Sequence, residues 1–486
     1  MSIDAEYLLT CLLMLPLFSS VICFAISPRK PSIWLNTLVS GALLLAAVSL
    51  AFTLFAAGSP ISIMLGGWEA TLGIRLYIDG LRSIMLLLTA TVGFATAIYA
   101  HSYFTDKQTA TRFWPLWWLL VAGLNGIFST GDIFTIYIML ELIGISAVCL
   151  IALNDSQNSM NAAYQYLLVG LFGSLSYLFG VALLYRTYGT LDILTLTDLL
   201  VENTSTYLAM AFCTVGMLLK CAVFPLHFWL PAAHSNAFAP ISAALSALVI
   251  KAAFFVIFIF WYDLARDITN TLANNFLATL GALAVLYGSF KAFTSPRLKL
   301  LIAYSTVAQI GYLFLVFPLV EASPEQAKVA VMYFIVAHAC AKAAMFMAAG
   351  VIQKALGHDR LADMQGVTTK LPLTVLVFAV TGASLIGIPP TGGFIAKWLM
   401  ITLAVEQGKW IWVAVLFTGG LLASAYLFRV LNLAFLIKDD SAQADTSINA
   451  KYYNLATMSS AIVLAFVTIA IGLNALWLTN LTSSLG

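Results

Sequence analysis

The chain has 486 residues, of which 62% are hydrophobic and only 9% are charged, with a mean hydropathy of +0.96. A water-soluble domain has about 25% charged residues, so this composition predicts a protein embedded in a lipid membrane. A net charge of +2 over the whole chain excludes the basic surface that nucleic-acid binding requires.

Taken in chain order, the sequence is a succession of apolar stretches, each long enough for the roughly 20-residue helix that crosses a membrane. These stretches lie at residues 6–26, 34–57, 77–100, 112–130, 132–153, 160–185, 207–230, 238–261, 273–293, 299–318, 327–352, 373–403, 410–437 and 455–480. They predict an all-α integral membrane protein with about fourteen transmembrane helices. The turn STGD at residues 129–132 separates the fourth helix from the fifth.

Two stretches between these helices are expected to lie at the membrane surface. They are residues 62–80, SIMLGGWEATLGIRLYIDG, and residues 189–200, GTLDILTLTDLL. The chain begins MSIDAEYLL, which is acidic, whereas a cleaved signal peptide begins with basic residues. The first apolar stretch is therefore expected to be a retained transmembrane helix.

Lysine and arginine are divided unevenly between the connections, and this bias sets the orientation of a membrane protein. Alternate connections contain Arg29, Lys30, Lys107, Lys291, Arg297, Lys299, Lys354, Arg360, Lys370, Lys438 and Lys451. The other connections contain, with few basic residues, Glu69, Asp192, Asp198, Glu202, Asp263, Asp267, Glu321, Glu325 and Glu406. We expect the basic side to face the cytoplasm, which places both termini on the non-cytoplasmic side of the cell (inner) membrane.

The cysteines suggest neither a metal site nor a disulfide framework. They all lie in apolar stretches and form no CxxC pair: Cys11, Cys23, Cys149, Cys213, Cys221 and Cys340. The chain also has no motif for binding a nucleotide, a flavin or an iron–sulfur cluster. We therefore expect neither a cofactor nor a bound metal.

Five ionisable residues lie inside the predicted helices rather than at their ends. They are Glu141, Lys220, Lys251, Lys342 and Lys397. A charge in the middle of a transmembrane helix costs at least about 2.5–3.5 kcal/mol on insertion scales, so such residues usually mark an ion or proton path. The plainer interpretations are a hydrogen bond between helices for Glu141 and snorkelling to the membrane surface for Lys251. Because Lys251 lies near the middle of its stretch, we favour a proton relay.

A histidine belongs to the same group of candidates. His338 and Lys342 are four residues apart in YFIVAHACAKAAMFMAAG and so share one face of a helix. Two proton-binding groups of one sign repel when both are charged, so each lowers the proton affinity of the other. This is the condition for passing a proton along. The alternative for His338 is an interior histidine with satisfied hydrogen bonds.

Prolines interrupt the seventh and the twelfth helix beside a lysine. Pro225 follows Lys220, and Pro389 and Pro390 precede Lys397. Proline removes a backbone donor and clashes with the carbonyl one turn earlier. In lipid the freed groups need protein or a water-filled cavity. A broken helix beside an ionisable residue, repeated five helices later, is typical of transporters built from structural repeats.

This spacing predicts four parts of the chain. They are three N-terminal helices (1–111), two five-helix repeats (112–261 and 273–437), and a C-terminal loop with the last helix (438–486). No segment remains for a soluble domain, so the activity is expected within the membrane or at its surface.

Residues 218–253, LLKCAVFPLHFWLPAAHSNAFAPISAALSALVIKAA, resemble the most recognisable stretch of the antiporter-like subunits of respiratory complex I, membrane-bound hydrogenases and Mrp-type sodium/proton antiporters. Glu141 in the fifth helix and GIPPTGGFIAKW in the twelfth agree with this resemblance, which covers nearly the whole chain. The resemblance implies two inverted five-helix repeats with broken seventh and twelfth helices. It also implies a line of charged groups and water across the middle of the membrane, and assembly with other membrane subunits.

The resemblance also implies roles for the interior charges. By position, Glu141 and Lys220 resemble the coupled glutamate–lysine pair of the family. Lys251, together with His338 and Lys342, resembles its central relay.

Three further positions have counterparts in the family. Lys397 resembles the terminal group of the relay, where members have either lysine or glutamate. His234 resembles a residue of a proton-uptake path from the cytoplasm, with a plain loop histidine as an equal alternative. His227 is similar to a motif position but lies across the Pro225 break from Lys220.

The sequence GGFIAKW favours an Mrp D-type subunit. The chain ends at Gly486 and lacks the long C-terminal amphipathic helix of the longest complex I homologue. We therefore expect the proton-translocating subunit of a multisubunit antiporter, with H⁺ and, as a further candidate, Na⁺ as transported ions. The alternatives are a proton-pumping subunit of NADH:quinone oxidoreductase or of a hydrogenase, hence part of an enzyme, and a subunit for proton-coupled inorganic carbon uptake.

Other classes of membrane protein fit less well. A haem subunit needs histidine pairs on facing helices, and His338 and His227 are the central candidates. Quinone binding leaves no sharp motif and stays open. A self-sufficient transporter of an organic solute would share the broken helices but would not need a chain of lysines.

Overall fold

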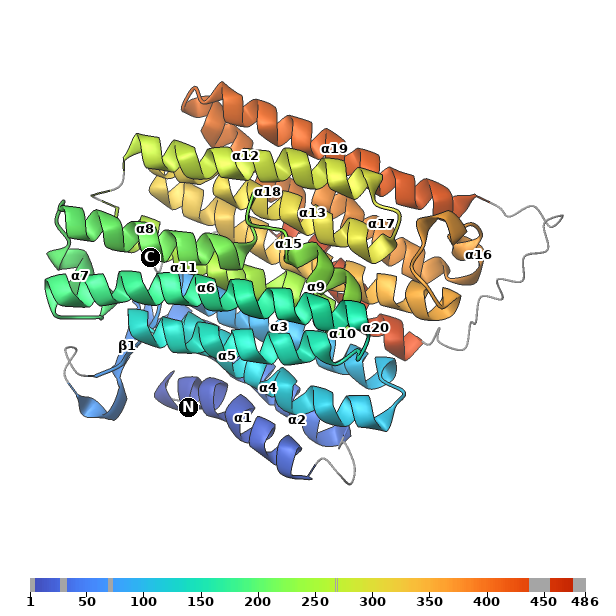
Figure 1. The fold of residues 1–486 in the computed structure, drawn as a ribbon, viewed down its shortest axis with the longest axis horizontal. Helices are drawn as coiled ribbons and strands as arrows, with labels where there is room; N and C mark the ends of the chain where they lie inside the picture. Colours follow the sequence, from blue (N-terminus) through green and yellow to red (C-terminus); the bar gives the residue numbers. More distant parts are fainter. Residues whose placement is uncertain are drawn as a thin grey trace.

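Long helices that run side by side make up most of the structure (Figure 1). The computed structural model describes residues 5–26, 33–68, 73–266, 268, 270–436 and 455–474. Three helices come first: α1 (Ala5–Ile26), α2 (Ile33–Ala57) and α3 (Gly80–Tyr103). The next part contains α4 (Lys107–Ser129), α5 (Ile133–Ala152), α6 (Gln157–Tyr188), α7 (Ile193–Leu199), α8 (Thr204–Cys221), α9 (Leu230–Asn236), α10 (Ala239–Ala244), the π-helical turn η2 (Leu245–Val249), α11 (Ile250–Ile259) and a second π-helical turn, η3 (Phe260–Leu264).

The second half begins with α12. It contains α12 (Thr271–Thr294), α13 (Leu298–Phe314), α14 (Phe317–Val320), α15 (Pro324–Leu356), the 3₁₀ turn η4 (Leu361–Asp363), α16 (Val367–Lys370), α17 (Pro372–Ile386), α18 (Gly392–Glu406), α19 (Trp410–Phe435) and α20 (Leu455–Leu473). In Figure 1, α7 lies at one end of the helices (left) and α16 at the other (right). Most of the expected C-terminal loop lies outside the described residues, as do the orientation residues Arg29, Lys30, Glu69, Asp267, Lys438 and Lys451.

Eleven helices within the described ranges are long and apolar enough to cross a membrane. In this count α10 to η3 form one continuous helix, and α13 forms another with α14. Each of the fourteen predicted stretches coincides with a helix, but α4, α20 and the two parts of the twelfth stretch are not among the eleven. The twelfth stretch is divided by its break into α17 and α18, of 15 residues each. Fourteen crossings therefore stay a prediction.

The expected all-α class is wrong for one segment, a β-hairpin between α2 and α3. Strand β1 (Ile61–Met64) pairs antiparallel with β2 (Arg75–Ile78), with Ile61 opposite Ile78. The 3₁₀ turn η1 (Leu65–Gly67) follows β1. The segment is too short to span a membrane as a helix, and pairing of the two strands satisfies their backbone groups instead.

Glycines and an ion pair shape this hairpin. Gly66 and Gly67 have φ of +70° and +71°, a region that glycine adopts readily. Arg75 Nε lies 2.6 Å from Asp192 Oδ2, the residue that caps α7. The two stretches expected at the membrane surface therefore lie together at one end of the molecule.

Several helix pairs approach so closely that their backbones touch, among them one pair in each half of the molecule. A Cβ on Gly173 of α6 would lie 2.9 Å from the carbonyl oxygen of Gly216 of α8. A Cβ on Gly281 of α12 would lie 2.5 Å from the carbonyl oxygen of Gly311 of α13. Small residues allow transmembrane helices to pack at such short separations. Each half of the molecule thus contains at least one tightly joined pair.

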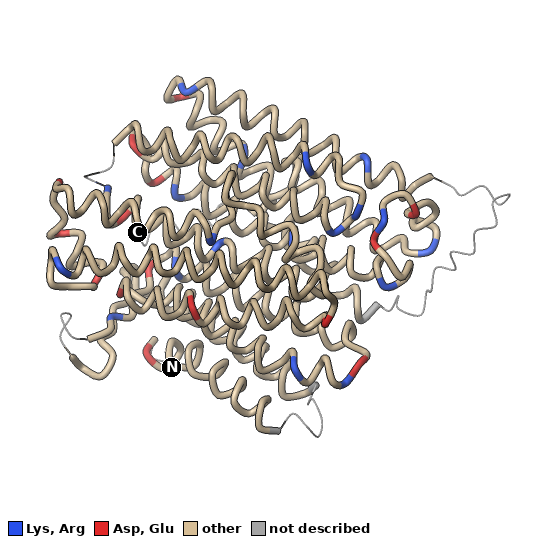
Figure 2. The backbone as a smooth tube through the Cα atoms, viewed as in Figure 1, with Lys and Arg blue, Asp and Glu red and all other residues tan. Residues whose placement is uncertain are grey.

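The two helices that carry Lys251, His338 and Lys342 are the most enclosed of the candidate membrane spans. The apolar window of α10 to η3 is entirely buried and that of α15 is 94% buried, against 33% for α6. Figure 2 shows most charged residues toward the helix ends and few along their middle. The charges in α11 and α15 are therefore surrounded by protein rather than by lipid.

Candidate functional site

Glu141 and Lys220 come together in the first half of the molecule. Glu141 lies in α5, and Lys220 lies in the last turn of α8. The distance from Lys220 Nζ to Glu141 Oε1 is 3.9 Å, and the side chains are 11% and 25% exposed, respectively. This distance allows an ion pair but exceeds that of a direct hydrogen bond. Small movements of either side chain therefore change the strength of the attraction between the amine and the carboxylate.

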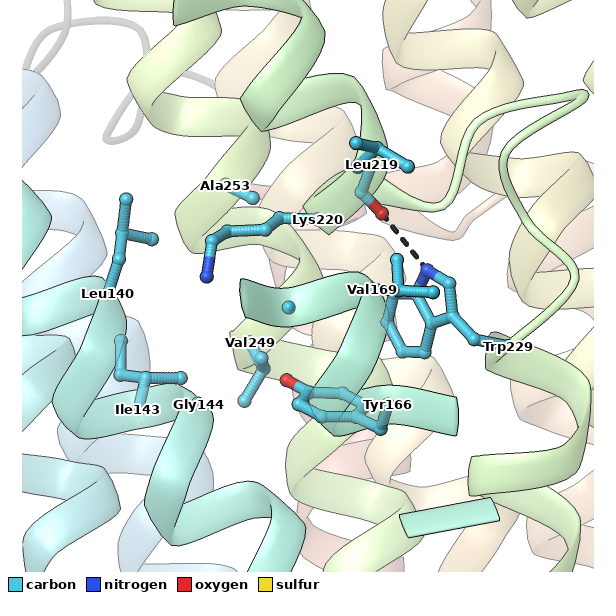
Figure 3. A pocket seen from close by; sticks show the side chains of 11 residues that line it. Leu140, Ile143, Gly144, Tyr166, Val169, Leu219, Lys220, Trp229, Val249 and Ala253 are labelled. Carbon is cyan, nitrogen blue, oxygen red and sulfur yellow. Dashed lines mark hydrogen bonds between the residues drawn. The ribbon is translucent and has the colours of Figure 1, made fainter. Parts of the chain in front are cut away.

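The amine of Lys220 extends into a small cavity (Figure 3). Leu140 and Ile143 of α5 lie on one side of it, and Tyr166 and Trp229 on another. The cavity has a volume of about 20 Å³, which is room for one water molecule. A water molecule there would be in position to exchange a proton with Lys220.

The break in the seventh helix lies directly after Lys220. Ala222 has a left-handed φ of +53°, and the Phe224–Pro225 peptide bond is cis. The carbonyl oxygen of Leu219, which lacks a continuing helix, accepts a hydrogen bond of 3.0 Å from the indole Nε1 of Trp229. Protein groups therefore satisfy the freed backbone, as the membrane interior requires.

Lys251 is completely buried in α11. Its amine donates to the backbone carbonyl of Ser246, in the π-helical turn η2. The hydroxyl of Ser246 lies 2.9 Å from Thr306 Oγ1 of α13. Lys251 therefore does not snorkel to the membrane surface; its amine binds groups in the interior.

His338 and Lys342 both lie on α15, but their surroundings differ. Lys342 Nζ donates to the carbonyl oxygen of Ile302, at 3.1 Å, and to Ser305 Oγ. The ring of His338 packs beside Phe334, and neither of its nitrogens has a hydrogen-bond partner within the described part of the chain. Buried polar atoms without a protein partner usually bind water. His338 is thus a buried position at which water would supply the missing hydrogen bonds.

Lys397 follows the second break. Pro389 and Pro390, joined by a cis peptide bond, lie between α17 and α18. The amine of Lys397 donates to the carbonyl oxygens of Leu385, at 2.7 Å, and Ile386, at 3.0 Å. These are the last two residues of α17, so Lys397 satisfies the backbone groups that the break leaves free.

The later lysines of the line differ from Lys220 in their partners. Across the described ranges, no carboxylate forms an ion pair with Lys251, Lys342 or Lys397. The amine of Lys397 instead lies 4.4 Å from the ring centroid of Tyr312, and the face of an aromatic ring attracts a cation. An acidic partner is therefore special to Lys220 among the lysines of this line.

Comparison with known proteins identifies the family. The transmembrane family described as NADH:quinone oxidoreductase/Mrp antiporter matches residues 130–423, a range that contains every residue of the line. The chain belongs to this family. Among its relatives in this family is NADH-quinone oxidoreductase subunit N of Desulforudis audaxviator (strain MP104C), 34% identical over 446 residues, which are 89% of this chain and 87% of the relative.

Further relatives of the NADH:quinone oxidoreductase/Mrp antiporter family come from antiporters. The D-type Na⁺/H⁺ antiporter subunit of Alkalihalophilus pseudofirmus (strain ATCC BAA-2126 / JCM 17055 / OF4) is 28% identical over 400 residues, which are 81% of this chain and 79% of the relative. A chain in the structure of the Mrp complex from Dietzia sp. DQ12-45-1b has the same fold, with a TM-score of 0.90 at 24% identity, covering 99% of this chain and 97% of that chain. The predicted family is thereby confirmed.

The two accessory histidines lie in different surroundings. His234 is completely buried in α9, beside Phe346 of α15, and neither ring nitrogen has a hydrogen-bond partner in the described part of the chain. It is therefore not a plain loop histidine. His227 packs between the rings of Phe224 and Tyr287, with centroids 5.6 and 4.9 Å away.

Sequence reasoning missed two buried lysines, Lys299 and Lys328. Lys299 has the sequence position of a loop lysine because it is the second residue of α13. It is only 1% exposed, its amine donates to the carbonyl of Ala237, and its backbone N–H donates to Asp359 Oδ2. No pattern in the neighbouring residues indicated this depth, because helix ends usually lie at the membrane surface.

Sequence reasoning also passed over the uncharged polar residues that contact the lysines or the residues bonded to them. They are Ser246, Ser305 and Thr306. The available signal was the run of polar residues inside the apolar stretch AYSTVAQIGY of α13.

Proposed function

We propose that this chain is the proton-translocating membrane subunit of a multisubunit, Mrp-type cation/proton antiporter, corresponding to its D-type subunit. One observation supports this above the others: titratable side chains, buried or at most 25% exposed, lie within the helices at and between the two breaks. They are Glu141, Lys220, Lys251, His338, Lys342 and Lys397. Membership of the NADH:quinone oxidoreductase/Mrp antiporter family supports the same proposal.

The first step of the proposed relay is at the ion pair. Burial disfavours the charged form of a lysine, whereas a nearby carboxylate favours it. Lys220 therefore holds its proton while Glu141 stays near, at 3.9 Å. When Glu141 moves away or is neutralised, Lys220 gives up its proton to water.

The later steps pass the proton across the middle of the bundle. In this proposal it moves through water to Lys251, then to His338 and Lys342, and then to Lys397. It leaves on the non-cytoplasmic side. His234 belongs to the uptake path from the cytoplasm, and His227 is an accessory position near the first break.

The proposal includes the surroundings of the chain. Other membrane subunits of the complex supply the driving cation exchange, with Na⁺ as the candidate cation beside H⁺. The protein spans the cell (inner) membrane with its basic connections in the cytoplasm and both termini outside. Its parts are residues 1–111, two inverted repeats at 112–261 and 273–437, and residues 438–486.

Exchange in everted membrane vesicles that contain the whole complex tests this function. We expect Lys220→Ala and Glu141→Ala each to abolish cation/proton exchange while the other subunits still co-purify. Lys107→Ala, at an exposed lysine at the start of α4, is the matched control and should exchange normally. Normal exchange by either of the first two variants would refute the relay.

A second host complex is favoured by sequence identity, which is 34% to an NADH-quinone oxidoreductase subunit N and 28% to the D-type subunit of an antiporter. In that complex the same line of residues would pump protons driven by quinone reduction. Purification in mild detergent separates the two proposals. Co-purifying redox subunits and NADH-driven proton movement would support the oxidoreductase; Na⁺-driven movement without them would support the antiporter.

A further inference from the structure

Besides Lys299 near its start, helix α13 carries three buried, uncharged polar residues in an apolar stretch. Ser305, Thr306 and Gln309 are at most 1% exposed. Ser305 and Gln309 are four residues apart and so share a face of the helix, and Thr306 lies beside them. The three residues contact the surroundings of different lysines of the line.

Thr306 connects α13 to the segment that holds Lys251. Its hydroxyl lies 2.9 Å from Ser246 Oγ, and Lys251 donates to the backbone carbonyl of that same serine. Thr306 Oγ1 also donates to the carbonyl of Ile302, at 3.0 Å. Lys251 and Thr306 of α13 therefore both bind Ser246.

Ser305 connects α13 to Lys342. The amine of Lys342 donates to Ser305 Oγ and to the carbonyl oxygen of Ile302. Ser305 Oγ donates to that same carbonyl, at 2.8 Å. Lys342, Ser305 and Thr306 thus lie within hydrogen-bonding distance of one carbonyl oxygen, that of Ile302, whose two lone pairs accept from two of these donors at a time. This shared acceptor joins the surroundings of Lys251 and Lys342 in a single hydrogen-bonded cluster.

Gln309 makes the third connection. Its Nε2 donates to the carbonyl oxygen of Leu385, at 3.3 Å, and the amine of Lys397 donates to the same oxygen, at 2.7 Å. A carbonyl has two lone pairs and accepts both donors. If the amine of Lys397 moves away, Gln309 keeps this carbonyl satisfied.

A plainer interpretation is that these are ordinary helix hydroxyls bonded to the preceding turn. Thr89 of α3 is such a case: it is completely buried and donates to Met85 O at 2.8 Å. Thr306 makes the same bond but also contacts a hydroxyl on another helix. The contacts across helices, each beside a different lysine, distinguish α13 from this interpretation.

We propose that Ser305, Thr306 and Gln309 are positioning residues that hold the three later lysines in both of their protonation states. The proposal rests on the proposed proton relay. A hydroxyl both accepts and donates, so Ser305 accepts from the charged amine of Lys342 and donates to its neutral form. A backbone carbonyl can do only the first. The transfer itself moves one proton from an ammonium to a neutral amine, through hydroxyls or water, with no other bond made or broken.

Substitutions on α13, measured in the intact complex in everted vesicles, test this proposal. We expect Thr306→Val and Ser305→Ala each to lower the maximal rate of Na⁺-driven proton movement by about tenfold, the effect of one lost hydrogen bond. The Na⁺ concentration for half-maximal rate should not change, because these residues do not contact the cation. Thr306→Ser, which restores the hydroxyl, should retain a rate within about twofold of the original. Gln309→Leu should also slow the maximal rate.

Thr89→Val is the matched control, since it removes the same type of bond from a residue that, in the described part of the chain, is hydrogen-bonded only to its own helix. It should leave the rate unchanged at equal amounts of complex. Ser305→Ala removes a single oxygen and supplies the same test if Thr306→Val reduces assembly. Full rates for Thr306→Val and Ser305→Ala, with Lys342→Ala inactive, would overturn the role of α13 and leave the relay intact. Full rates for Lys342→Ala and Lys251→Ala would instead refute the relay itself.

Discussion

The lysines beside the two helix breaks differ in their partners and in their place relative to the break. Lys220 precedes its break, faces a carboxylate at 3.9 Å, and leaves the freed carbonyl of Leu219 to Trp229. Lys397 follows its break and itself donates to the two carbonyls at the end of α17.

The difference concerns what holds the charge on each lysine. The C-terminal end of a helix has a partial negative charge of about half an electron, and it stays in place as long as the helix does. A carboxylate on a neighbouring helix can move away or take up a proton. Lys220 therefore has a partner that can be changed by events elsewhere in a complex, whereas Lys397 has a permanent one. In the proposed relay, control would therefore act at the first break, and the second break would be a fixed end of the path.

The strongest test of this contrast is Glu141→Gln, which removes the charge but keeps the shape. An amine that loses a nearby carboxylate in the membrane interior holds its proton less tightly. We expect exchange in everted vesicles to fall by at least about a hundredfold, equivalent to about 2.7 kcal/mol, with the complex assembled. Glu406→Gln, at an exposed position at the end of α18, should exchange normally. A rate near the original for Glu141→Gln would remove the distinction between the two breaks.

The second test compares stability at the two breaks. Lys397→Met leaves the carbonyl of Ile386 without its side-chain donor, at a cost of about 1–3 kcal/mol for a buried unsatisfied group. Lys220→Met leaves the carbonyl of Leu219 bonded to Trp229. Both variants should fail to exchange, but we expect Lys397→Met to lower the melting temperature of the purified complex more. Equal melting temperatures would show that Lys397 does not cap α17.

Trp229→Phe tests the hydrogen bond that satisfies the carbonyl of Leu219 at the first break. It removes the indole donor of Leu219 but keeps an aromatic ring against Tyr166. The carbonyl of Leu219 keeps a backbone partner, the N–H of Ala222 at 3.2 Å, so we expect a loss of only about 0.5–1.5 kcal/mol and a severalfold slower exchange. Thermal unfolding and vesicle assays check this.

The control for Trp229→Phe is Trp410→Phe, because Trp410 is 64% exposed at the start of α19. It should change neither the melting temperature nor the exchange rate. If both tryptophan variants behave alike, the hydrogen bond at the first break contributes nothing.

The smallest effect is expected at the start of α18. Thr391 caps this helix through a hydrogen bond of 3.4 Å from Phe394 N, whereas α9 has no such side-chain cap. Thr391→Ala should cost about 0.5 kcal/mol, at the low end for a cap because the bond is long. Thr391→Ser should restore the melting temperature; if it does not, the methyl group rather than the cap is responsible.

Much of this site could be predicted from the sequence because its main signals are local. A lysine within twenty apolar residues, or two prolines in a long apolar stretch, stands out without any knowledge of the fold. Glu141 and Lys220 could be paired through the family resemblance, and the structure brings them to 3.9 Å. The roles of these residues in a relay stay a prediction, as does the choice of an Mrp D-type subunit over an oxidoreductase subunit.

The remaining features depend on which distant segments pack together. Ser246 and Thr306 are sixty residues apart, and neither is unusual in a transmembrane helix. Lys299 looks like a surface residue until α9 and α10 cover it through Ala237. The hairpin was expected at the membrane surface, but a short alternating segment gives little indication of strands when its partner is unknown.

The close contact of Gly281 with Gly311 has a mechanical consequence for the second half. No atom can be inserted between α12 and α13 there, so α13 can neither roll nor slide against its neighbour without breaking the contact. Ser305, Thr306 and Gln309 therefore lie on a helix whose position against α12 is fixed by this contact. In the proposed relay, any movement that accompanies proton transfer is therefore expected in side chains, water and the helices α11, α15 and α17.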